Sequence, residues 1–366
     1  MGTCTSLMAM IVAVILEPPS AQPCDMDRIR VADDGKGFVL GAWGKSFMPW
    51  GLNYGNAGRL IEDYWEIEWE TVAGDFRDMK ALGANVVRVH LQFGKFMDGP
   101  DRPNARALER LGKLLALAQN TGLYLDLTGL GCYRKADVPA WYDRLAEEDR
   151  WAAQARFWGA VAGRCAESRA VFCYDLMNEP IAGGGDKKPG DWYSGKLVGQ
   201  YDFVQWIALD ARGRPREEIA RAWIKRLSGA VRAHDKDHLI TVGLLPWVPG
   251  WGHLSGFVPA KVAPELDFIS VHIYPEKGKV DEALQVLKQF AVGKPVVVEE
   301  TFPLACSTAE LEAFLKRSLG PACGWMGHYD GLTPERLEGL KKEKRLTIHQ
   351  ALLLEWLKLF RRLKPE

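Results

Sequence analysis

Apolar residues along this chain fall into two kinds of run, short continuous ones and longer ones with helical spacing. The short runs are rich in Val, Ile, Leu and aromatic residues, as is typical of strands buried on both faces. They predict strands that end near Tyr54, Leu91, Leu130, Asn178, Leu245, Tyr274, Glu300 and Tyr329. Between the strands, helices are predicted over residues 68–82, 104–121, 149–168, 216–234, 279–290, 308–319 and 347–363.

This alternation of strand and helix predicts the α/β class and a single closed (β/α)8 TIM barrel rather than an open sheet. Residues 28–45 precede the first barrel strand and are interpreted as a short N-terminal β-hairpin that plugs the barrel bottom. Residues 181–215 form a long loop after the fourth strand, and loops of this length are usually functional or disordered. Residues 246–266 are rich in Gly and Pro, so their helix is expected to be short or irregular.

The composition narrows the class of function. Lys and Arg together number 47, as do Asp and Glu, so the formal net charge is zero. The chain therefore has no strong basic field to recruit nucleic acid or an anionic membrane. Fourteen Trp is a high count for this length. Aromatic faces stack on sugar rings, although most of these Trp are expected to lie in the core.

The N-terminal segment resembles a secretory signal. An apolar run over residues 7–16 is too short to span a bilayer, and small residues near Ala21 could form a cleavage zone. The positively charged region that usually precedes such a run is missing. Residues 1–23 are interpreted as a possible signal peptide or a disordered tail, and residues 24–366 as the barrel domain. Export to the periplasm or the medium is expected, with a cytoplasmic location as the alternative.

The seven Cys do not form a metal or redox motif. They contain no C-x-x-C pair, so zinc-ribbon and thioredoxin-type sites are not expected. Removal of a signal containing Cys4 would leave six, which permits disulfides without establishing them. Free buried thiols are expected for several of these residues.

Glutamates end two of the predicted strands. Glu179 follows Asn178 at the end of the fourth strand, and Glu299 and Glu300 end the seventh. In a barrel, the carboxyl ends of the strands carry the active site, so folding should bring these acids together. Two carboxyls flanking a glycosidic bond are the working groups of most glycoside hydrolases. Strand alternation sends Glu299 and Glu300 to opposite faces, so one should face the helical layer or a loop, paired with a cation. The residues alone do not choose between the two.

Two other predicted strands carry polar residues suited to the same site. Arg88 lies inside an apolar strand, where it needs an anion, and either a catalytic carboxylate or a structural Asp could supply one. His90 is two residues further along and shares its face. His272 and Tyr274 share one face of the sixth strand, and the Tyr274 hydroxyl could donate a hydrogen bond to the nucleophile. Core packing is the alternative for these two residues.

The segment from His234 to His238 resembles a metal site, but we do not interpret it as one. It follows a helix and precedes the fifth strand, which places it at the barrel bottom, where residues usually serve stability. No His-x-His follows the first strand either. A metal-dependent barrel hydrolase is therefore not expected, and the predicted chemistry requires no metal or organic cofactor.

These motifs, in this order, resemble glycoside hydrolase family 5, the cellulase and mannanase family of clan A. The resemblance extends from residues 47–54 to Gly324-Trp325. It implies that Glu179 is the acid/base and, by counting along the motif from Pro295, that Glu300 is the nucleophile, with Glu299 as the alternative. Residues that match the supporting positions of the family are Arg88, Asn178, His272 and Tyr274.

The sequence departs from the family pattern in three places. Thr301-Phe302-Pro303 replaces the aromatic-Gly pair that follows the nucleophile. The third strand ends in Asp126-Leu127-Thr128-Gly129, where cellulase-like members often carry His. On the eighth strand, His328 stands where the platform Trp under the sugar is expected, so Trp325 is considered as its substitute. The sugar specificity of the family therefore transfers poorly.

The resulting hypothesis is a retaining glycoside hydrolase that cleaves a β-linked oligo- or polysaccharide of mannan or glucan type by double displacement. It predicts that the carboxyls lie about 5 Å apart, whereas about 9 Å would indicate inversion. On the long loop, Trp192, Tyr193 and Trp206 are candidates for subsite walls, and anchoring of the loop is an equally open alternative. A glycan-binding barrel without activity and a transglycosylase are the other functions considered. A carbohydrate is the only partner expected, and the sequence does not predict the oligomeric state.

Overall fold

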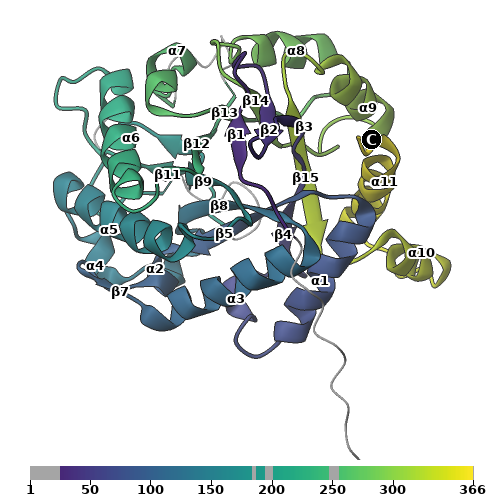
Figure 1. Cartoon of the computed structure of the whole chain (residues 1–366), viewed down its shortest axis with the longest axis horizontal. Helices are drawn as coiled ribbons and strands as arrows, with labels where there is room; N and C mark the ends of the chain where they lie inside the picture. Colours follow the sequence, from purple (N-terminus) through teal and green to yellow (C-terminus); the bar gives the residue numbers. More distant parts are fainter. Residues whose placement is uncertain (1–24, 184–186, 194–200, 247–254, 366) are drawn as a thin grey trace, which may run out of the picture.

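The computed structural model describes residues 25–183, 187–193, 201–246 and 255–365, where parallel strands close into a barrel (Figure 1). The closed barrel contains β4 (Trp50–Gly55), β5 (Val86–Gln92), β8 (Tyr124–Gly131), β9 (Val171–Asn178), β12 (Leu239–Leu244), β13 (Ile269–His272), β14 (Val296–Glu300) and β15 (Gly324–Asp330). β15 pairs with β4, which closes the barrel. The predicted (β/α)8 fold is confirmed, and each strand ends within two residues of its predicted position. The possible signal peptide lies outside the described residues.

Helices surround the barrel (Figure 1). The larger ones are α1 (Trp69–Leu82), α3 (Ala105–Thr121), α5 (Glu147–Cys165), α6 (Arg216–Arg232), α8 (Val280–Lys288), α9 (Thr308–Arg317), α10 (Pro334–Lys342) and α11 (Ile348–Leu363). All of these were predicted except α10, whose N-terminus is capped by the Thr333 side chain. The Gly/Pro-rich segment forms only α7 (Pro259–Val262) and a 3₁₀ turn (Ala263–Glu265) within its described part, as expected.

The connections between barrel strands and helices contain short strands, short helices and 3₁₀ turns. In the long segment that follows β9, β10 (Pro180–Ile181) pairs in parallel with β11 (Gln205–Trp206). The connection between β5 and α3 contains α2 (Phe93–Phe96), β6 (Met97–Gly99) and β7 (Arg102–Pro103). A 3₁₀ turn (Ile61–Asp63) precedes α1, and a second (Lys135–Asp137) with α4 (Ala140–Asp143) precedes α5.

An antiparallel sheet of β1 (Ile29–Val31), β2 (Phe38–Leu40) and β3 (Lys45–Phe47) covers the bottom of the barrel. The ring of Phe38 meets those of Phe172 and Phe268 edge to face, each with centroids 5.2 Å apart. Phe172 and Phe268 lie at the N-terminal ends of β9 and β13. The predicted hairpin is therefore present, extended by a third strand, and its apolar side chains seal this end of the barrel.

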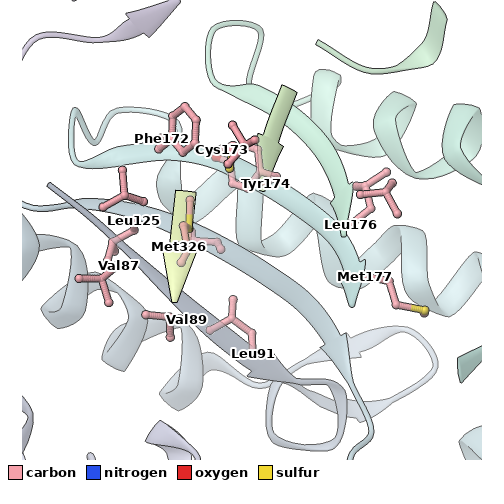
Figure 2. Close-up of a cluster of buried hydrophobic side chains, with 14 of the residues drawn as sticks. Val87, Val89, Leu91, Leu125, Phe172, Cys173, Tyr174, Leu176, Met177 and Met326 are labelled. Atoms are coloured by element: carbon pink, nitrogen blue, oxygen red, sulfur yellow. The ribbon is translucent and has the colours of Figure 1, made fainter. Parts of the chain in front are cut away.

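Alternation along the strands separates the apolar layer from a polar interior. Val87, Val89 and Leu91 are buried along β5 in the apolar cluster that Figure 2 shows. Arg88 lies between them in sequence, yet it contacts residues of β4, β9 and β14 and so points into the barrel. The side chains that face the helices thus form the core, and the interior near the strand ends is left for polar groups.

The seam between β15 and β4 is covered by α11. A Cβ at Gly327 would lie 1.9 Å from Cζ2 of Trp356, so only glycine allows this helix to approach so closely. The Trp356 indole donates a hydrogen bond to the His328 carbonyl at 3.0 Å, and Trp50 of β4 stacks on Phe360 with centroids 4.7 Å apart. α11 therefore contacts both strands at the point of closure.

The described cysteines are free thiols. Cys132, Cys165 and Cys173 are buried, and Cys306 and Cys323 are half-buried. This agrees with the expectation of free buried thiols; Cys4 and Cys24 lie outside the described residues. Across the described ranges, every helix is too short or too polar to cross a membrane.

Candidate active site

Glu300, at the end of β14, is held on both carboxylate oxygens. The Arg88 guanidinium donates to Oε1 at 2.5 Å, and the Tyr274 hydroxyl donates to Oε2 at 2.6 Å. Burial alone would raise the pKa of Glu300, but the positive charges of His272 and Arg88 outweigh it and hold that pKa well below its usual value. Glu300 is therefore ionised and fixed in orientation, as a nucleophile must be.

Glu179 follows β9 in a strained backbone conformation. Its φ is +46°, in the left-handed region that residues other than glycine seldom adopt. Its backbone N–H donates to the Gly243 carbonyl at 2.8 Å, which holds the turn in place. The side chain remains 14% exposed, and its Oε1 lies 2.9 Å from Nδ1 of His272. Strain of this kind is often found where the fold must aim one side chain into a site.

The two glutamates share one site. An oxygen of Glu179, an oxygen of Glu300 and a ring nitrogen of His272 all lie within 4.8 Å of one another. The two glutamates have different partners. Glu300 accepts hydrogen bonds from Arg88 and Tyr274, whereas Glu179 contacts His272. One carboxylate is thus locked and ionised, and the other stands beside a group that can exchange a proton.

Arg88 is fully buried and organises the interior of the barrel. Besides Glu300, it donates to Asn53 Oδ1 at 2.9 Å, to Asp175 Oδ2 at 2.7 Å and to Asn178 Oδ1 at 3.0 Å. Both kinds of partner considered for Arg88 are therefore present, the candidate nucleophile Glu300 and the buried Asp175. The amide nitrogen of Asn178 donates to the Phe203 carbonyl at 3.1 Å, so this side chain is fixed at both ends.

The prediction that one of Glu299 and Glu300 faces the helical layer or a loop is wrong. Pairing between β13 and β14 shifts register after Val271, so that His272 pairs with Glu300 and strict alternation fails at Glu299. The Glu299 side chain is fully buried and accepts from Ser270 Oγ at 2.9 Å, with His272 Nε2 at 3.3 Å and Arg88 Nη2 at 3.4 Å. Both acids therefore lie inside the barrel, Glu300 toward the mouth and Glu299 beneath it. The expected cation, Arg88, is present.

His328 takes part in the site through Tyr274. Its Nε2 lies 3.0 Å from the Tyr274 hydroxyl, and the two rings are nearly parallel with centroids 6.2 Å apart. Because the single Tyr274 proton is donated to Glu300, the hydrogen of this contact must come from His328 Nε2. Burial lowers the pKa of His328, which favours the neutral ring.

His90 lies on the same inner face of β5 as Arg88. Its Nδ1 is 2.6 Å from the Tyr133 hydroxyl. Burial, together with the charge of Arg88, holds the pKa of His90 well below its usual value, so the ring is neutral.

Trp325 does not reach the site. It is three residues from His328 on β15, so alternation places it on the opposite face. Its indole donates to Ser318 Oγ at 2.9 Å, and its ring packs edge to face on Trp50. The proposed substitution of Trp325 for the platform Trp is therefore wrong, because this ring belongs to the layer between barrel and helices.

Of the aromatic residues in the long loop, Trp192 is an anchor. It is only 2% exposed, its indole donates to the Asp143 carbonyl at 3.0 Å, and the Arg150 guanidinium lies 4.3 Å from its ring. Tyr193 likewise donates to Asp143 Oδ1 at 2.9 Å. These contacts correct the expectation of a subsite wall at Trp192. Trp206 is half-buried, with Lys187 over its ring at 4.3 Å, and remains a candidate.

Some functional residues were missed by the sequence analysis. Asn53 accepts from Arg88 and donates to the carbonyls of Glu299 and Gly327 at 2.9 and 3.0 Å. Asp175 and Asp126 also lie buried inside the barrel. All three are polar residues within apolar strands. This is the same signal that pointed to Arg88, so these residues were also detectable in the sequence.

Gly243 of β12 was also missed, and it provides space for the cluster. A Cβ at this position would lie 2.9 Å from each of Arg88 Nη2, Glu299 Oε2 and His272 Nε2. Its backbone N–H donates to Asp175 Oδ1 at 2.7 Å. Glycine is therefore required here by the close approach of charged side chains.

Two sets of side chains in the described ranges have the spacing of metal ligands. One is Glu179, His272 and Glu300, and the other is Asp126, Asp175 and Glu299. In both sets, carboxylates are already bonded to Arg88 or to the His272 ring. A cation would have to compete with these groups at the same oxygens, which makes either set a poor metal site.

Comparisons with known proteins agree with this geometry. A family model described as Cellulase (glycosyl hydrolase family 5) matches residues 50–301. Mannan endo-1,4-beta-mannosidase A of Podospora anserina is 24% identical over 220 residues, which cover 53% of this chain and 50% of that protein. The chain thus spans about half the length of this curated relative.

Solved structures share the fold. The exo-beta-1,4-mannosidase of Opitutaceae bacterium strain TAV5 superposes with a TM-score of 0.64 at 19% identity, over 91% of this chain and 62% of that one. The endo-1,4-beta-mannanase of Rhizomucor miehei superposes with a TM-score of 0.59 at 18% identity, over 82% of this chain and 90% of that one. At these identities, the likeness shows the architecture of the barrel.

Proposed function

Because the chain belongs to glycosyl hydrolase family 5, we propose that it is a retaining glycoside hydrolase acting on a β-linked glycan. The observation that carries this proposal is the pair of carboxylates, Glu179 and Glu300, with oxygens within 4.8 Å of each other. Retaining enzymes place their two carboxyls about 5–5.5 Å apart, whereas inverting enzymes leave about 6.5–9.5 Å for a water molecule. The short separation supports double displacement.

In the first step, Glu300 attacks the anomeric carbon while Glu179 protonates the departing glycosidic oxygen. A glycosyl-enzyme ester forms on Glu300, and the leaving sugar departs as an alcohol. Arg88 and Tyr274 prepare this step, because they keep Glu300 ionised and aim it. His272 stands beside Glu179, where its ring supports the movement of the proton.

In the second step, Glu179 acts as the base. It removes a proton from water, the water oxygen attacks the anomeric carbon, and the ester bond to Glu300 breaks. The sugar leaves with the configuration it had in the substrate. Both steps use the same two carboxylates, with Glu179 alternating between its protonated and ionised forms.

The proposed substrate is a β-1,4-linked, mannose-containing glycan. This proposal rests on the names of the relatives, which include an endo-1,4-beta-mannosidase, an exo-beta-1,4-mannosidase and an endo-1,4-beta-mannanase. The site itself adds that Tyr274, which donates to Glu300, is in turn in contact with His328. A glucan is the competing substrate, and both can be compared in one assay.

The mechanism can be tested by trapping the intermediate. A 2-deoxy-2-fluoro-β-mannoside with an activated leaving group should inactivate the enzyme, and peptide mass spectrometry should find one glycosyl group on Glu300. The same treatment of Glu300→Gln should give no label. A label on Glu299 would contradict the assignment of the nucleophile.

The stereochemistry is read separately by proton NMR of the first product formed from an aryl β-mannoside. We expect the β-anomer to appear first and the α-anomer only by mutarotation. Initial formation of the α-anomer would exclude retention. Turnover of the β-glucoside but not of the β-mannoside would exclude the proposed sugar and leave the mechanism intact.

A further inference from the structure

A second acidic group lies directly beneath the catalytic glutamates. It consists of Asp126 of β8, Asp175 of β9 and Glu299 of β14, whose carboxylate oxygens lie within 4.8 Å of one another. All three side chains are fully buried. The group adjoins the active site through Glu299, which contacts the ring of His272.

If every acid in this region were ionised, the negative charges would outnumber the positive charges in contact with them. Five carboxylates meet here, those of Asp126, Asp175, Glu179, Glu299 and Glu300. Among the described residues, the cations in contact with them are Arg88 and, when protonated, His272. Five negative charges against two positive ones leave an excess of three, which a buried site does not tolerate.

Asp126 is the acid for which ionisation is least supported. In the described part of the chain, neither of its oxygens accepts a hydrogen bond, although both are fully buried. Asp175, in contrast, accepts from Arg88, from Thr128 Oγ1 at 2.8 Å and from the Gly243 backbone. Glu299 accepts from Ser270. Buried acceptors are nearly always paired, so the state of Asp126 requires an explanation.

We propose that Asp126 is a neutral acid that donates its proton to Glu299, and that Glu299, kept ionised, holds His272 as an imidazolium against Glu179. A proton on Asp126 turns one unpaired acceptor into a donor and brings the two carboxyls into a single hydrogen bond. It also removes one of the excess charges. Asp126 and Glu299 are thus positioning residues that act through His272.

The His272 ring is placed to carry this influence to the acid/base. Its Nε2 lies 3.3 Å from Glu299 and its Nδ1 2.9 Å from Glu179. Both nitrogens face carboxylates, and only the imidazolium donates from both. Burial alone would lower the pKa of His272. The surrounding carboxylates, of which Glu300 has the largest effect, raise this pKa to about 10. Burial and the charge of Glu299 raise the pKa of Asp126 well above its usual value.

The groups that face this arrangement come from several elements. They are Arg88 from β5, Cys173 and Asp175 from β9, Glu179 after β9, and Glu300 from β14. Burial raises the pKa of Cys173 well above its usual value, so this thiol adds no negative charge. Arg88 stays charged because its carboxylate partners outweigh its burial.

The first experiment measures the pH dependence of kcat/KM, and it rests on the proposed function. The basic limb reports loss of the His272 proton, because the imidazolium is the group that faces the acid/base. Glu299→Gln removes a negative charge from Nε2 of His272, so the basic limb should move to lower pH by about one unit or more. Asp126→Asn should leave the basic limb in place, because an amide N–H donates to Glu299 as the neutral acid does.

The two variants together decide the proposal. An unmoved basic limb in Glu299→Gln would overturn it, since His272 would then not depend on Glu299. An equal shift in Asp126→Asn would also overturn it, because that shift requires Asp126 to be ionised in the native protein. Glu62→Gln is the matched control. It removes a buried carboxyl held by Gln92, outside this cluster, and should not move the limb.

The second experiment needs no activity and so separates this inference from the proposed function. Infrared difference spectra at neutral pH, native protein minus Asp126→Asn, should show the C=O stretch of a protonated carboxylic acid. Nitrogen-15 NMR should show an imidazolium that persists at about pH 9, well above the unperturbed pKa, and is lost in Glu299→Gln. Absence of the carboxylic acid band, or a neutral His272 at that pH, would overturn the proposal even if the enzyme proves active.

Discussion

At the N-terminal end of the barrel, the ring of Phe38 meets those of Phe172 and Phe268 edge to face, whereas at the C-terminal end Arg88 and His272 lie among five carboxylates. The first end gains stability from apolar burial and from aromatic contacts. The second concentrates charges that repel one another and carries a strained Glu179. The barrel therefore supplies rigidity at one end to hold, at the other, an arrangement unfavourable by itself.

Among the variants considered, Glu300→Gln should separate activity from stability most strongly. We expect kcat/KM on an aryl β-glycoside to fall at least about 10⁴-fold, as it does when other enzymes lose their nucleophile. The melting temperature should fall by no more than about 3 °C, because glutamine keeps the shape and one acceptor oxygen of the side chain even though the attraction of the charge to Arg88 and His272 is lost. Kinetics and calorimetry on the same preparation check both. A large loss of stability would show that the charged end also holds the fold together.

The opposite result is expected for Phe38→Ala at the sealed end. Phe38 is 2% exposed, and truncation of a buried Phe costs about 3–5 kcal/mol of unfolding free energy. Urea unfolding measures this loss, and kcat/KM at temperatures below the transition should change less than about twofold. If activity fell in proportion to stability, the two ends would be coupled, which would contradict the separation of stability at one end from activity at the other.

Gly243→Ala should disturb the charged end without removing any charge. The new methyl group would press on Arg88, Glu299 and His272, and a displacement of about 1 Å in a catalytic site can cost about 10²-fold in rate. The matched control is Gly229→Ala in α6, where a Cβ meets no atom within 4 Å and the helix should gain about 1 kcal/mol. Equal activities for the two variants would contradict the role given to Gly243.

The smallest effect concerns an ordinary structural acid at the sealed end. Asp235 accepts from the Tyr174 hydroxyl at 2.6 Å and lies 2.6 Å from His238 Nδ1. Burial raises its pKa, but the hydrogen bonds from His238 and Tyr174 outweigh this and lower the pKa below its usual value. Asp235→Asn should cost about 1–3 kcal/mol at neutral pH.

The sign of the pH dependence follows from the lowered pKa. Asp235 stabilises the fold above its unfolded-state pKa, and this contribution is lost as pH falls through the folded-state value. The difference in unfolding free energy between native protein and variant should therefore shrink toward acid pH. A difference that grows as pH falls would contradict the argument.

The sequence predicted much of the fold because strand and helix patterns are local. Glu179, Glu300 and Arg88 could be placed because residues at the carboxyl ends of barrel strands converge. The position of Glu299 could not, since the register shift after Val271 depends on pairing between strands. Trp325 is different, because its distance of three residues from His328 already indicates in the sequence that it lies on the other face of β15.

The role of Trp192 required the folded structure. An aromatic residue on a long loop suits a sugar platform and a loop anchor equally, and only contacts distant in sequence decide between them. Here the decisive partners are Asp143 and Arg150, both from the region before the fourth strand. The same holds for Asp126, because only the folded neighbours reveal that, within the described ranges, no donor faces its two carboxyl oxygens.

The packing of Trp356 against Gly327 also governs when, during synthesis, the site can form. β15 pairs with β4, and α11 covers this seam with Trp356 bonded to the carbonyl of His328. Through Tyr274, His328 is connected to Glu300. A nascent chain still on the ribosome, with α11 inside the exit tunnel, would expose the edges of β4 and β15 to neighbouring chains. Exit of α11 from the ribosomal tunnel is therefore the step at which this polypeptide covers the seam between β4 and β15 and completes the support of Glu300.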